Sequence, residues 1–142
     1  MTHDKTVKFL MNEVKQKRKD LGTKKRFIPV TNAKFMFDNE TYMNLNVESN
    51  PYNYARALAF LLMRQNYYNN ACKQLGLAPD KFLWGGYTVK EWQTDFKARV
   101  EILDWKSRKS KLDSIEKRLE ALLSEEGKTA AALDDITSLL NE

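Results

Sequence analysis

Histidine and cysteine, two side chains used in much of enzyme catalysis, are scarce in this 142-residue sequence, which has one of each. His3 lies at the N-terminus, where chains commonly fray, so a mechanism that needs a positioned imidazole has no candidate in the body of the chain. Cys72 falls on the apolar side of a predicted helix, where we expect a small buried residue. A single cysteine excludes an intrachain disulfide and a four-cysteine zinc site. We therefore expect no enzymatic activity, cofactor, metal or small-molecule substrate, although a hydrolase that uses carboxylates alone stays open.

Long apolar runs are also missing. The longest, Ala57 to Met63, is far too short to span a bilayer, and no apolar signal region follows Met1. We therefore expect no membrane association and a reducing, cytoplasmic setting. The excess of lysine over arginine and the many asparagines suggest an AT-rich genome, and a bacterial or phage source fits this composition.

Glycine and proline are absent from Thr88 to Glu126. Thr88 and Glu91 have the spacing of a capping box, and Tyr87 and Trp92 occupy the positions of a hydrophobic staple, so a helix is predicted to begin here. An unbroken helix over this stretch would be ~58 Å long. That length exceeds the expected radius of gyration of a compact domain of this size, ~14–15 Å. The helix therefore either projects from the body or is met by another helix, from this chain or from a second one.

The whole sequence contains 42% hydrophobic residues, and together with its residue patterns this predicts a mainly helical α+β domain. Helices are expected over residues 4–21, 50–63 and 67–75, because their apolar residues recur at helical spacing. Alternation over residues 33–47 predicts a β-hairpin, to which residues 27–30 add a short edge strand. Residues 50–63 are apolar almost all round, which is typical of a central core helix. We expect residues 1–104 to form a globular domain and residues 105–142 to form a helical extension.

The extension has an apolar seam that resembles a short coiled coil or one side of a helical hairpin. Leu112, Ile115, Leu119 and Leu122 follow one another at three- and four-residue intervals. A last amphipathic helix carries Leu133, Ile136, Leu139 and Leu140, and it either folds back on the seam or docks on a partner. Trp105 lies out of register with both apolar stripes of the long helix, which makes it a candidate surface anchor.

The net charge of +5 is unevenly distributed, with a basic start, a basic segment at residues 105–111 and an acidic end. The leading hypothesis is a non-enzymatic interaction or regulatory protein, such as a bacterial or phage accessory factor. It would bind a larger protein assembly, or self-associate, through Trp105 and the leucines and isoleucines of the C-terminal helices. The alternative is a nucleic-acid-binding accessory protein in which basic side chains contact phosphates: Lys17, Arg18, Lys19, Lys24, Lys25, Arg26, Lys106, Arg108, Lys109 and Lys111.

Overall fold

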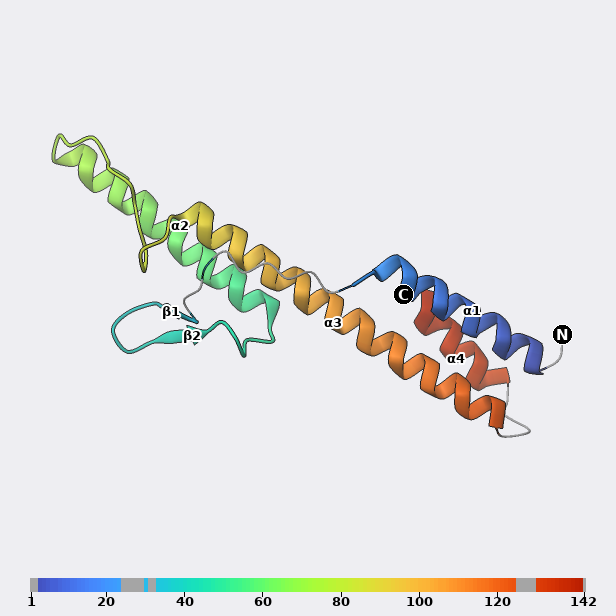
Figure 1. Ribbon diagram of the computed structural model, residues 1–142. Coiled ribbons are helices and arrows are strands. Elements are labelled where there is room, and N and C mark those ends of the chain that lie inside the picture. The colour runs from blue at the N-terminus through green and yellow to red at the C-terminus, as the bar shows by residue number, and fades with distance from the viewer. Residues whose placement is uncertain (1–2, 24–29, 31–32, 125–129, 142) are drawn as a thin grey trace. The chain divides into compact units, whose positions relative to one another are not determined.

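A computed structural model describes residues 3–23, 30, 33–124 and 130–141, apart from the side chains of residues 3–5, 124 and 130–135. The described elements run in the order α1 (His3–Leu21), β1 (Lys34–Met36), β2 (Tyr42–Asn44), α2 (Pro51–Gln74), α3 (Val89–Ser124) and α4 (Ala130–Asn141). The predicted class, mainly helical with a small hairpin and a long C-terminal helix, is confirmed (Figure 1).

The chain divides into two units, one of residues 1–24 with 104–142 and one of residues 25–103. We call these the terminal unit and the central unit. Helix α1, which we expected in the same domain as the hairpin, instead belongs to the unit that contains the C-terminal helices.

The terminal unit consists of α1, the last part of α3 and α4, which lie side by side (Figure 1). Its core is built from apolar residues at helical spacing on each of the three helices: Val7, Leu10, Val14, Leu112, Ile115, Leu119, Leu122, Ile136 and Leu140. Full burial of a leucine or isoleucine side chain contributes about 1.5–3 kcal/mol, so this shared core is the main stabilising contact of the three helices.

The central unit packs the β-hairpin against α2 and the first part of α3. β1 and β2 pair antiparallel with Phe35 opposite Met43, and both side chains are buried. The connecting turn is closed by Asp38, whose Oδ1 accepts hydrogen bonds from the backbone N–H groups of Glu40 and Thr41. These bonds hold the pKa of Asp38 below its usual value. The hairpin prediction is confirmed, and the predicted edge strand at residues 27–30 lies outside the described residues except for buried Val30.

Helix α2 differs from the prediction because it is one helix where two were expected. It begins as predicted, with the Asn50 side chain accepting from the Tyr52 N–H and Pro51 in the first turn. Residues 64–66 contain neither glycine nor proline, so nothing in the backbone interrupts the helix before Gly76. Gly76 ends it at φ +69°, with the Leu77 N–H donating to the Cys72 carbonyl in a Schellman motif.

Helix α3 begins with the predicted capping box. The Glu91 N–H donates to Thr88 Oγ1 at 3.2 Å, and the Thr88 N–H donates to Glu91 Oε1 at 3.1 Å. The predicted staple is also present, as an edge-on contact of the Tyr87 and Trp92 rings at 5.6 Å. The helix then continues without a break through the polar residues 106–111 to Ser124. Ion pairs four residues apart, Asp95–Arg99 and Asp104–Arg108, support this continuity.

The core of the terminal unit provides a first prediction. Leu119 is fully buried, so we expect Leu119→Ala to lower the free energy of unfolding by about 2–5 kcal/mol, through lost burial and the cavity left behind. Leu123, which is 44% exposed on the same helix, is the matched control, and Leu123→Ala should cost less than about 1 kcal/mol. Urea unfolding followed by circular dichroism measures both, and equal losses would show that the Leu119 face is not buried in solution.

Candidate protein-interaction surface

The predicted C-terminal seam is covered by the chain itself. Leu112, Ile115, Leu119 and Leu122 pack against the apolar faces of α1 and α4, and Ile136 and Leu140 of α4 are buried with them. Leu133 belongs to α4, but its side chain lies outside the described residues. Of the two alternatives, folding back on the chain describes this arrangement, and α1 is a third member that the sequence pattern did not indicate. A partner would therefore need a different surface.

Trp105, the candidate surface anchor, is half-buried. Its Nε1–H donates to the Gly22 carbonyl at 3.0 Å, just beyond the end of α1. Gly22 has φ +72° and its N–H donates to the Arg18 carbonyl, so Trp105 binds the left-handed residue that ends α1. The indole is thus tied to the end of a neighbouring helix, and only part of its ring faces solvent.

The two basic clusters are partly neutralised within the terminal unit. Arg18 bridges Asp113 and Glu116, each at 2.6 Å, which links α1 to α3. Arg108 pairs with Asp104 at 2.9 Å and Lys109 with Asp113 at 3.1 Å. Lys19 and Lys106 are exposed, Lys17 and Lys111 are half-buried, and Lys24, Lys25 and Arg26 lie outside the described residues. The structure therefore pairs Arg18, Arg108 and Lys109 with carboxylates of α3 and does not gather them on one open basic surface.

Side chains that could take part in catalysis or bind a metal ion are few in the described part of the chain. There, three or more histidine, cysteine, aspartate or glutamate side chains never gather closely enough to hold a metal ion. Cys72 is buried on the inner side of α2, as expected. None of the described helices is both long and apolar enough to cross a membrane.

A buried polar cluster joins α2, α3 and the end of the hairpin. Asp95 is fully buried, and its Oδ2 accepts from Arg99 Nε at 2.8 Å. Arg99 Nη1 and the Tyr54 hydroxyl both donate to the Leu45 carbonyl. Burial raises the pKa of Tyr54. The other carboxylate oxygen of Asp95 has no hydrogen-bond partner in the described part of the chain. The cluster ties the chain after β2 to both helices, and its buried position makes it a structural element.

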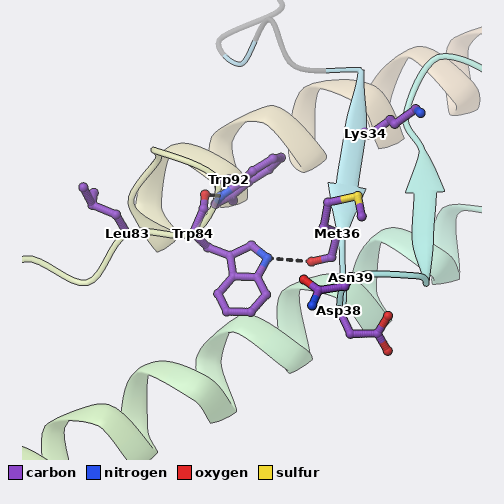
Figure 2. Close-up of a pocket in the computed structure, with 8 residues that line it drawn as sticks. Lys34, Met36, Asp38, Asn39, Leu83, Trp84 and Trp92 are labelled. Carbon is purple, nitrogen blue, oxygen red and sulfur yellow. Dashed lines mark hydrogen bonds between the residues drawn. The ribbon is translucent and has the colours of Figure 1, made fainter.

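A shallow pocket of about 290 Å³ lies between the hairpin and the start of α3 (Figure 2). Trp84 is central to it, and its Nε1–H donates to the Met36 carbonyl at 2.7 Å. Lys34 and Asp38 are the charged lining residues, and Figure 2 shows their side chains pointing away from each other. A binding pocket for a small molecule usually has a few convergent polar groups, and these lining residues do not provide them.

The outer face of α2 is the most apolar exposed surface on the helices of the central unit. We use this name for Tyr52, Ala55, Ala59, Leu62, Met63 and Tyr67, which all face away from the core. Tyr52 is 71% exposed, Leu62 52%, Met63 47% and Tyr67 59%. The inner side of the helix carries Tyr54, Ala57, Leu61 and Cys72, which are buried. These two sets lie on opposite sides of the helix, since residues three, four and seven apart share a face.

This surface corrects the sequence-based interpretation of residues 50–63. Because residues 50–63 are apolar almost all round, the sequence indicated a central core helix. In the structure the core covers only the inner side, because the hairpin and α3 both pack there. The excess of apolar residues was the signal that marked a second face, and the sequence alone does not show which of the two faces the core.

Comparisons with protein families, curated proteins and solved structures find no match to this chain.

The buried polar cluster leads to a prediction on stability. Arg99→Met leaves the buried Asp95 carboxylate without its partner, so we expect it to destabilise the protein by about 3–5 kcal/mol. The double substitution Asp95→Leu/Arg99→Met removes both charges and should be less costly than the single one. Arg108→Met is the matched control, because the Asp104–Arg108 pair has the same spacing but is mostly exposed, and it should cost less than about 1 kcal/mol. Chemical denaturation tests this ranking, and it would be contradicted by a double variant that is less stable than Arg99→Met.

The Arg18 bridge predicts a pH dependence. The Arg18 hydrogen bond, followed by that of Lys109, holds the pKa of Asp113 below its usual 3.8. A lowered folded-state pKa contributes stability that is present above pH 3.8 and is lost as the pH falls through the folded-state value. Arg18→Gln should therefore lower the melting temperature by a few degrees at most at pH 7, and should have a smaller effect at pH 2. Lys19→Gln, which removes the same charge from an exposed position, is the control in thermal melts, and an Arg18 effect of the same size at both pH values would rule out this linkage.

Proposed function

We propose that this protein is a non-enzymatic interaction protein that binds another protein through the outer face of α2. The observation that carries the proposal is the second apolar face of this helix, opposite the face that forms the core. Contiguous exposed apolar side chains on a folded protein commonly mark an interaction site. Removing the exposed part of a leucine or methionine from water contributes on the order of 1 kcal/mol, so several such residues can support a stable complex.

The two surfaces expected from the sequence, the C-terminal apolar seam and the basic clusters, are less open than the outer face of α2, which favours α2 as the binding site. The C-terminal leucines and isoleucines are covered within the terminal unit, and several basic side chains there are paired with carboxylates. Neither group offers as open a surface as α2. The single buried cysteine is compatible with an accessory protein that acts in a reducing compartment such as the cytoplasm.

In-cell photo-crosslinking tests this function. A photoreactive phenylalanine analogue at position 62 in the native host should form an adduct between this chain and a different polypeptide. The same analogue at Phe9, which is 57% exposed on α1, is the matched control and should give no such adduct. The two positions compare equally exposed apolar sites on different units.

A pair of substitutions completes this test. Leu62→Asp/Met63→Asp should abolish co-purification of the crosslinked partner, while Phe9→Asp should retain it. Both variants change exposed side chains, so their free energies of unfolding, measured by circular dichroism, should stay within about 0.5 kcal/mol of that of the parent protein. Adducts of equal yield at positions 62 and 9, adducts to this chain alone, or unchanged co-purification by the double variant would each refute the proposed function.

A further inference from the structure

The charges of α2 are all of one sign. The helix contains Arg56, Arg64 and Lys73 and has no aspartate or glutamate. Arg56 lies three residues before Ala59 and seven before Met63, which places it on the outer face. Lys73 continues the same side of the helix, seven residues after Asn66 and eleven after Leu62. Arg56 therefore lies within the first half of the outer face, and Lys73 lies beyond its last apolar residue, Tyr67.

These cations lack carboxylate partners among the described residues. Arg56 donates to the Asn53 side chain at 2.7 Å, and Arg64 lies over the Phe60 ring at 5.0 Å. The nearby acids are engaged by neutral donors, since Glu48 accepts from the Asn50 N–H and Asp80 accepts from the Tyr68 hydroxyl. In the terminal unit, by contrast, Arg18, Arg108 and Lys109 each pair with an acidic residue of the same chain.

The shape of the face indicates what kind of segment it accepts. Ala55 and Ala59 are small, so the backbone of a second helix can approach the first half of α2 closely, while Leu62 and Met63 supply larger side chains for its grooves. A second copy of α2 is a poor occupant, because it would bring only further cations to a face that already has an excess.

We infer that the occupant of the outer face of α2 is an amphipathic helix of another protein, with an apolar stripe flanked by aspartate and glutamate. The inference rests on the proposed function, which says only that a protein binds there. The apolar stripe covers Ala59, Leu62 and Met63, and the acidic flanks pair with Arg56 and Lys73. Charge complementarity then selects this helix over neutral or basic ones of the same apolar pattern.

Two designed peptides test this inference on the full chain. Both are labelled helical peptides with the same leucine stripe, and one has glutamate at every flanking position where the other has lysine. Fluorescence anisotropy at low salt should show the glutamate peptide binding at least about tenfold more tightly, and the difference should shrink at 0.5 M salt as the charges are screened.

Variants of the chain identify the contacts. Arg56→Glu/Lys73→Glu should invert the preference between the two peptides, Leu62→Asp should weaken both, and Phe9→Asp should change neither. Equal binding of the peptides, preference for the lysine peptide, or no binding of either would overturn the inference. The crosslinked adduct at position 62 does not depend on the partner's charge. If that adduct forms but the two peptides bind equally, this inference is overturned and the proposed function still stands.

Discussion

The long helix α3 has two apolar stripes, and covering both of them is the constraint on which the rest of the structure depends. Val89, Trp92 and Phe96 face the hairpin and α2, whereas Leu112, Ile115, Leu119 and Leu122 face α1 and α4. The polar residues 106–111 separate the stripes, and the helix continues through them because no glycine or proline interrupts it. One helix therefore supplies part of two separate cores. The central core is built from consecutive elements, whereas the terminal core joins segments far apart in the sequence, so the first helix of the chain belongs with the last one.

Polar contacts specify the details that apolar burial leaves open. In the central unit, Arg99 and Tyr54 both bind the Leu45 carbonyl, so the chain leaving the hairpin is held to α3 and α2 at one point. In the terminal unit, Arg18 fixes α1 against α3 through two carboxylates, and Trp105 binds the residue that ends α1. These contacts use several of the basic and aromatic residues that a sequence pattern would assign to a partner. Among the described residues nothing covers the outer face of α2 in this way, and that contrast underlies the proposed interaction surface.

Sequence patterns were most informative where the determining forces are local. The Thr88–Glu91 capping box, the Tyr87–Trp92 staple, the Asn50 cap and the β-hairpin depend on residues within a few positions of one another, and all are present. The boundary predicted between Met63 and Tyr67 was wrong, because polar residues do not end a helix when the backbone permits it to continue. The exposed apolar face of α2 was missed for a different reason. A helix that is apolar on both sides has two possible inner faces, and the packing of the hairpin and the first part of α3 decides which one is buried.

The sequence by itself determined where the helices and turns begin and which faces are apolar, since capping, turn chemistry and periodicity act over a few residues. The tertiary structure decided how those faces are matched. Val7, Leu10 and Val14 of α1 cover the seam of α3 together with α4, a pairing between segments that are far apart in the chain. The same matching leaves Leu62, Met63 and Tyr67 exposed. Hydrophobic burial is non-directional, so periodicity identifies a face that must be covered, and only the packed arrangement shows which segment covers it and which face remains open to a partner.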